Sequence, residues 1–106
     1  MINFDPTVGD EIKKTRPAVV VSSDALGRLN LKLVAPITEW QASFTHSLWH
    51  VPLNPNSGNG LRKASAVDAF QLRGVDIARF VKWLGRLSAD EMAEIAAAVA
   101  AVVEYE

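Results

Sequence analysis

The chain has 106 residues, of which 49% are hydrophobic and 22% are charged, so it is long and apolar enough to bury a core of its own. We expect one domain spanning residues 1–106. The absence of cysteine excludes disulfides and thiolate metal sites, and it is typical of proteins in a reducing cytoplasm. No apolar run approaches the roughly 20 residues of a membrane span, and the N-terminus lacks a signal-peptide pattern. We therefore expect a cytoplasmic protein with no membrane contact.

The charged residues are distributed unevenly along the chain, although the formal net charge is only −1. Residues 1–63 contain seven basic and five acidic side chains, whereas residues 64–106 contain four basic and seven acidic ones. This asymmetry favours a basic side that could face a polyanion and an acidic back. Ordinary surface charge is the alternative interpretation.

The first two thirds of the sequence predict short strands separated by turn residues. β-branched runs and alternation indicate strands at 17–22, 31–37, 48–53, 65–70 and 81–87. In the second of these, alternation places Leu31, Leu33, Ala35 and Ile37 on one face. Residues 23–30 resemble a hairpin loop, 54–60 are rich in Gly, Asn and Pro and predict a loop, and 76–79 predict a short helical turn.

The last segment changes period and predicts a helix over residues 89–103. Ser88 and Glu91 have the spacing of a capping box, in which each side chain bonds the other residue's amide. An apolar stripe follows at helical spacing, made of Met92, Ile95, Ala96, Val99, Val102 and Val103. The pattern predicts a mostly β fold with a C-terminal helix, arranged as a small, strongly curved barrel.

Three segments resemble the MazF/PemK family of type II toxins (mRNA interferases): FDPTVGDEIKKTRPAVVVSSD at 4–24, VAPIT at 34–38, and the run from Gly60 through QLRGVD to LGRLSADEMAEI at 84–95. The resemblance implies an SH3-like or CcdB-like barrel that forms a homodimer. It also implies a toxin-antitoxin endoribonuclease that cuts single-stranded RNA sequence-selectively, without metal or cofactor, to leave a 2′,3′-cyclic phosphate. A cognate antitoxin protein is the implied inhibitor, and we expect it to contribute an acidic, extended segment that competes with RNA.

The sequence also departs from the family pattern. Family members begin with a full first strand before the Asp-Pro pair, whereas only Met1 to Phe4 precede Asp5 here. We therefore expect one strand of the barrel to be short or missing. Ala64 and Gly74 replace residues that are often Asp and Thr in the family, so the RNA sequence preference does not transfer.

Two residues match the catalytic positions of the family. RNA cleavage by its own 2′-hydroxyl requires removal of that proton, stabilisation of a pentacovalent phosphorane and protonation of the leaving oxygen. Arg16 precedes the rigid Pro17 at a strand start, and its guanidinium suits phosphate oxygens. Thr38 ends a strand on the face opposite to Ala35, and its hydroxyl could bond a phosphate or the attacking oxygen. The alternative for Arg16 is a surface arginine paired with Asp10 or Glu11. The alternative for Thr38 is a threonine that serves only the β-strand.

Six further polar residues match family positions near the RNA groove, where cations would position the backbone and an amide could read a base edge. They are Lys13, Lys14, Lys63, Ser65, Gln71 and Arg73. Ordinary solvated side chains are the alternative for each.

His46 and His50 suggest acid–base catalysis, but no orienting carboxylate stands near them in the sequence, so we do not assign them a role. Trp40, Phe44 and Trp49 could stack a base, although burial of Trp49 in the barrel is the simpler expectation.

Two other classes of function remain open from the sequence. A CcdB-like toxin would bind gyrase rather than cut RNA, using aromatic residues on its terminal helix, where this chain has only Tyr105. A catalytically inactive barrel would serve only to bind antitoxin or RNA. Incubation with single-stranded RNA in EDTA distinguishes these possibilities from a nuclease.

Overall fold

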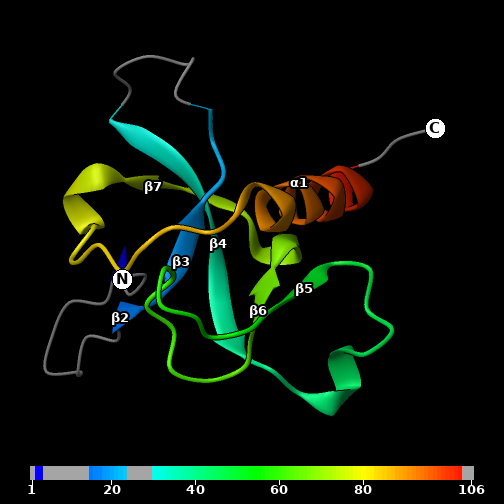
Figure 1. The fold of residues 1–106 in the computed structure, drawn as a ribbon. Helices are drawn as coiled ribbons and strands as arrows, with labels where there is room; N and C mark the ends of the chain where they lie inside the picture. Colours follow the sequence, from blue (N-terminus) through cyan, green and yellow to red (C-terminus); the bar gives the residue numbers. More distant parts are fainter. Residues whose placement is uncertain (1, 4–14, 24–29, 104–106) are drawn as a thin grey trace, which may run out of the picture.

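A curved antiparallel sheet built around one long strand forms most of the fold (Figure 1). The computed structural model describes residues 2–3, 15–23 and 30–103. The strands are β1 (Ile2–Asn3), β2 (Thr15–Arg16), β3 (Ala18–Val20), β4 (Leu31–Glu39), β5 (His50–Leu53), β6 (Ser65–Asp68) and β7 (Arg73–Asp76). Three short 3-10 helices, η2 (Ala42–Phe44), η3 (Ala69–Gln71) and η4 (Ile77–Arg79), and the helix α1 (Ala89–Val103) complete the described elements.

Strand β4 organises the sheet because it pairs along both of its edges. One edge pairs with β3, in the register Val19↔Ala35, while the other pairs first with β7 and then with β6. β5 adds to the far side of β6, and β1 pairs separately with β2. The described strands form a curved sheet that does not close into a barrel. The predicted class, mostly β with a C-terminal helix, is confirmed.

The predicted helix over residues 89–103 is confirmed at both ends. The Ser88 amide donates to Glu91 Oε1 at 2.8 Å, and the Glu91 amide donates to Ser88 Oγ at 3.1 Å, so the capping box is formed. Ile95 and Ala98 are buried, while Met92, Val99 and Val102 pack against the core. The predicted stripe was wrong at its margins, because Ala96 and Val103 are exposed.

The helix covers one face of the sheet and buries the main core there. Alternate residues of the strands supply this core together with Ile95 and Ala98 of α1; they are Val19, Ala35, Ile37, Val51, Leu53 and Val67. A second, smaller cluster lies on the opposite face, where Ala18 packs against the buried Val34 and Val75. Leu31 and Leu33, which share a face with Ala35, are exposed because they lie beyond the main core.

The predicted strand at 81–87 was wrong. Residues 81–88 follow an irregular path between η4 and α1 and belong to no ladder. The Arg86 amide donates to the Gly58 carbonyl at 2.8 Å, which ties this segment to the predicted loop at 54–60. A Cβ at Gly85 would collide with the same carbonyl, so only glycine permits this approach.

Two short elements and one loop connect these strands. β7 was not predicted, because its four residues include Gly74 and two charged side chains and lack an apolar alternation. The helical turn predicted at 76–79 is confirmed by η4, at whose start the Ala78 amide donates to Asp76 Oδ1 at 2.8 Å. Of the loop predicted at 23–30, residues 24–29 lie outside the described part of the chain. No helix among the described residues combines the length and apolar character required to cross a membrane.

Candidate functional site

Arg16 and Thr38 lie at neighbouring positions of adjacent strands. The β3–β4 ladder pairs Ala18 with Pro36, and the next bond along it joins the Ile37 amide to the Pro17 carbonyl at 2.9 Å. One further step in the same register places Arg16 opposite Thr38, and β2 contacts β4 at this point. Residues directly opposite in an antiparallel pair project to the same face. The structure therefore brings together the two residues that the resemblance marks as catalytic.

This pair belongs to the face of the sheet opposite to α1. Thr38 alternates with Ile37, whose side chain lies in the helix-covered core, so the two point to opposite sides. Arg73 pairs with Val34, which shares the parity of Thr38, so Arg73 is on the same face as Thr38. Arg16 and Arg73 are exposed and Thr38 is half-buried. Two guanidinium groups and a hydroxyl are thus carried by one face.

The other candidate RNA-binding residues are placed less uniformly. Lys63 is exposed and pairs with Glu39 at 3.4 Å, and both side chains are mostly in solvent. Gln71 donates from its amide to Asp68 Oδ2 at 2.8 Å. Ser65 is buried and its hydroxyl donates to the Lys63 carbonyl at 2.8 Å, so it does not present a free group at the surface. Lys13 and Lys14 lie outside the described residues.

A buried polar cluster accompanies the site, and sequence reasoning missed it. His50 Nε2 lies 3.7 Å from Asp68 Oδ2, with both side chains about one-tenth exposed, and Ser47 Oγ is 2.6 Å from His50 Nδ1. The expectation that no carboxylate stands near the histidines was wrong. The β5–β6 register pairs His50 with Asp68 although they are far apart in sequence, so spacing carried no signal of the contact.

The environment of His50 fits an internal structural group. Its ring stacks on Phe44 at 3.8 Å between centroids, and both ring nitrogens face protein partners. Asp68 in turn accepts from the Phe70 amide at 3.1 Å, which begins η3. His46, by contrast, is exposed. The expected burial of Trp49 was wrong, because 40% of it is exposed and its ring lies beside the exposed Phe70.

The chemistry available on this face is hydrogen bonding to an anion. A guanidinium offers several donors in a fixed plane and keeps its charge near neutral pH, and a hydroxyl can donate to or accept from an oxygen beside it. Among the described residues, no three His, Asp or Glu side chains gather as a metal site requires. A guanidinium and a hydroxyl at neighbouring positions are the groups that stabilisation of negative charge on a phosphate requires.

A comparison with protein families decides which class of protein this is. Residues 1–103 match the model described as PemK-like, MazF-like toxin of type II toxin-antitoxin system. The chain belongs to this family. Because the match spans nearly the whole chain, the PemK/MazF assignment covers the helix-covered core and the face that carries Arg16 and Thr38 alike.

Individual relatives of the PemK/MazF chain agree with this assignment. It is 37% identical over 96 residues to the endoribonuclease toxin ChpB of Escherichia coli, covering 89% of this chain and 79% of the relative. It is 31% identical over 100 residues to the endoribonuclease MazF9 of Mycobacterium tuberculosis, covering 89% and 82%. Among solved structures, the MazE-MazF crystal structure (Form-II) from Deinococcus radiodurans has a TM-score of 0.75 at 25% identity, covering 99% of this chain and 90% of that one. The toxin MazF-mt6 of M. tuberculosis has a TM-score of 0.72 at 22% identity, covering 86% and 88%, and shows the same fold.

Proposed function

We propose that this protein is the toxin of a toxin-antitoxin pair and acts as a sequence-selective endoribonuclease on single-stranded RNA in the cytoplasm. The observation that carries the proposal is the placement of Arg16 opposite Thr38 on the face turned away from α1. Relatives of 37% and 31% identity that are named endoribonucleases support it. We further propose that the active unit is a homodimer and that a cognate antitoxin silences it.

The proposed reaction is an internal transfer at phosphorus. The 2′-oxygen attacks the adjacent phosphorus, the bond from phosphorus to the 5′-oxygen breaks, and a 2′,3′-cyclic phosphate remains. The proton lost from the 2′-hydroxyl is balanced by a proton gained at the leaving 5′-oxygen. Arg16 donates to the equatorial oxygens of the phosphorane, where negative charge is greatest, and Thr38 bonds a phosphate oxygen or the attacking 2′-oxygen.

The remaining candidate residues have binding roles in this proposal. Arg73 lies on the same face and contacts a flanking phosphate, while Lys63, which pairs with Glu39 at the end of β4, contributes positive charge there. The amide of Gln71 is held by Asp68, so its free oxygen can accept from a base. Lys13 and Lys14 precede Arg16 in the chain and extend the proposed basic surface. Ser65 has a structural role, because its hydroxyl donates to the Lys63 carbonyl and stabilises the turn there.

The test is cleavage of a labelled single-stranded RNA by purified protein in the presence of EDTA. We expect discrete fragments whose new 3′ ends resist phosphatase until acid opens the cyclic phosphate. A double-stranded version of the same RNA should remain intact. Absence of cleavage by folded protein would overturn the proposal, and binding of gyrase without cleavage would replace it with the gyrase-binding alternative.

A further inference from the structure

The loop at 54–60 contains an asparagine, Asn59, that is followed directly by a glycine. The chain has five asparagines, and the residues that follow them are Phe4, Leu31, Pro55, Ser57 and Gly60. A backbone nitrogen can attack the side-chain carbonyl carbon of the asparagine before it, and a Cβ on the attacking residue hinders this approach. Glycine has no Cβ. Asn59 is therefore the asparagine with the least hindered neighbouring nucleophile.

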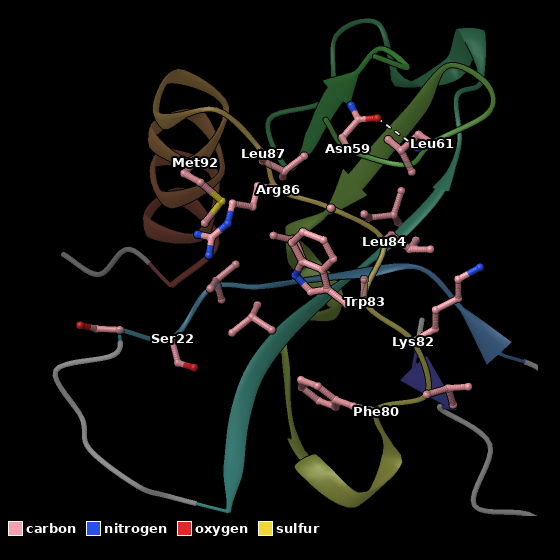
Figure 2. Close-up of a pocket in the computed structure, with 18 residues that line it drawn as sticks. Ser22, Asn59, Leu61, Phe80, Lys82, Trp83, Leu84, Arg86, Leu87 and Met92 are labelled. Atoms are coloured by element: carbon pink, nitrogen blue, oxygen red, sulfur yellow. Dashed lines mark hydrogen bonds between the residues drawn. The ribbon is translucent and has the colours of Figure 1, made fainter. Parts of the chain in front are cut away.

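The fold holds the Asn59 side chain by both of its polar atoms. Asn59 is 4% exposed, whereas the other residues of the loop at 54–60 are exposed. Its Oδ1 accepts from the amides of Asn56 at 3.2 Å and Leu61 at 3.0 Å, and its Nδ2 donates to the Asn54 carbonyl at 2.8 Å. Figure 2 shows this side chain beside Leu61, at one end of the groove that β3 and residues 80–87 line. Attack at Cγ makes that carbon tetrahedral and releases Nδ2, so these bonds oppose the reaction.

A small set of polar bonds keeps the loop closed against residues 84–86. Asn56 Oδ1 accepts from the amides of Gly58 at 2.8 Å and Asn59 at 2.9 Å. The Gly58 carbonyl accepts from the Arg86 amide at 2.8 Å. Because Asn59 is the one buried residue of the loop, the loop can open without unfolding the core beneath the helix.

Conversion of the Asn59 amide to an acid would prevent the loop from closing again. An aspartate at position 59 has no Nδ2 hydrogens, so a carboxylate oxygen would face the Asn54 carbonyl oxygen in a buried position. An isoaspartate adds the side-chain carbon to the main chain and displaces Gly60. Gly60 has a φ of 69° and lies so close to the Leu84 carbonyl that a Cβ would collide with it. Neither product restores the native contacts.

We propose that Asn59 is a self-modification site, protected while the loop at 54–60 is closed and reactive when it opens. The Gly60 nitrogen forms a bond to Asn59 Cγ, the bond from Cγ to Nδ2 breaks, and the Gly60 amide proton leaves with Nδ2 as ammonia. Water then breaks one of the two ring bonds to the Gly60 nitrogen. Cleavage at Cγ gives aspartate, and cleavage at the Asn59 carbonyl carbon gives isoaspartate.

Repeated opening of the loop therefore converts the protein irreversibly and limits the lifetime of its native fold. This chemistry does not depend on the proposed nuclease function, since Asn59 belongs to neither the face of Arg16 and Thr38 nor the residues proposed to bind RNA.

The test measures conversion of each asparagine in the full chain, incubated at mildly alkaline pH with and without denaturing urea. Fragment mass spectrometry locates each acid by its gain in mass over the amide. In urea, Asn59 should convert at least about tenfold faster than each of the other asparagines, because glycine follows Asn59 alone. Without urea, its conversion should slow at least about tenfold, because the reaction then requires loop opening. Similar rates for all asparagines in urea, or equal Asn59 rates with and without urea, would overturn the proposal.

Variants of Asn56 test the role of loop opening while leaving the reacting pair intact. Asn56→Ala removes the acceptor for the Gly58 and Asn59 amides, whereas Asn56→Asp keeps an acceptor oxygen there. Without urea, Asn56→Ala should convert Asn59 about fivefold faster than the parent, the equivalent of one neutral hydrogen bond, and Asn56→Asp should match the parent. In urea the three proteins should react at one rate. An unchanged rate for Asn56→Ala without urea would show that the loop does not protect Asn59.

Asn59→Asp reproduces one of the two products and tests its consequence. It should unfold at a lower urea concentration than the parent, because the donor to the Asn54 carbonyl is replaced by an acceptor. Asn56→Asp adds the same charge at an exposed position of the same loop and should unfold near the parent. A parental unfolding midpoint for Asn59→Asp would mean that the loop accepts the product, and the proposed limit on the native fold would be wrong.

Discussion

Arg16 occupies the position opposite Thr38, across the same ladder that bonds the Ile37 amide to the Pro17 carbonyl. The two residues are 22 positions apart in the sequence and are joined by the connection between β3 and β4. Pro17 restricts the backbone between Arg16 and β3, so the position from which the Arg16 side chain projects is fixed. In the proposed mechanism, a phosphate bound at this point contacts the guanidinium and the hydroxyl at once.

Thr38→Ala should reduce the rate of RNA cleavage by roughly tenfold and act on the same step as Arg16. The hydroxyl supplies one neutral hydrogen bond, which is worth about 0.5–1.5 kcal/mol. If the two residues serve one phosphate, the double variant with Arg16→Ala should lose less than the product of the single losses. Single-turnover cleavage rates measure this coupling, and fully multiplicative losses would show that the residues act independently.

His50→Gln should lower the melting temperature while leaving single-turnover cleavage within a few-fold of the parent. The imidazole is nearly buried, stacked on Phe44, hydrogen-bonded to Ser47 and 3.7 Å from Asp68, so its loss removes packing and polar contacts inside the fold. Thermal unfolding and cleavage are measured on the same preparation. A stable His50→Gln protein with cleavage reduced a hundredfold would instead place His50 in the chemistry.

Gly60→Ala should destabilise the fold by about 1–3 kcal/mol through backbone strain, with a steric collision in addition. Gly60 has a φ of 69°, and a Cβ there would run into the carbonyl of Leu84. The substitution would push the segment 80–87 away from the loop at 54–60. Urea denaturation checks the effect, with Gly74→Ala as the matched control, since a Cβ at Gly74 meets nothing. Equal stability of the two variants would contradict this prediction.

We predict that the protein is a homodimer in solution at tens of micromolar, an order-of-magnitude range for such assemblies. Leu48, Phe70, Val81 and Trp83 are each more than half exposed, which is more large apolar surface than a small monomer normally leaves in water. Light scattering across a dilution series measures the mass. A constant monomer mass throughout that range would contradict the prediction.

The sequence predicted the helix and several strands well because their signals are local. The capping box and the stripe at Met92, Ile95 and Val99 lie within a few turns of one helix, so they determine it without help from the rest of the fold. The same holds for the loop at 54–60, whose Asn59 bonds its own neighbours Asn56 and Leu61.

The errors concern features that depend on strand pairing. Residues 81–87 have strand-like composition, but a strand needs a partner along its length, and within the described residues this segment joins no ladder. The contact of His50 with Asp68 follows from the β5–β6 register, which no spacing in the sequence reveals. Thr38 and Arg16 were identified through family resemblance, and only the β3–β4 register places them together.

In the proposed mechanism Arg16 stabilises the phosphorane, and single-turnover cleavage by Arg16→Ala is the sharpest test of this role. We expect the rate to fall by about 10²–10³, as for other charge-stabilising donors, while RNA affinity falls far less and the melting temperature hardly changes, since Arg16 is exposed. Arg16→Lys keeps the charge but loses the planar guanidinium, so its cleavage rate should lie between those of the parent and Arg16→Ala. Cleavage at the parental rate by folded Arg16→Ala would contradict the mechanism.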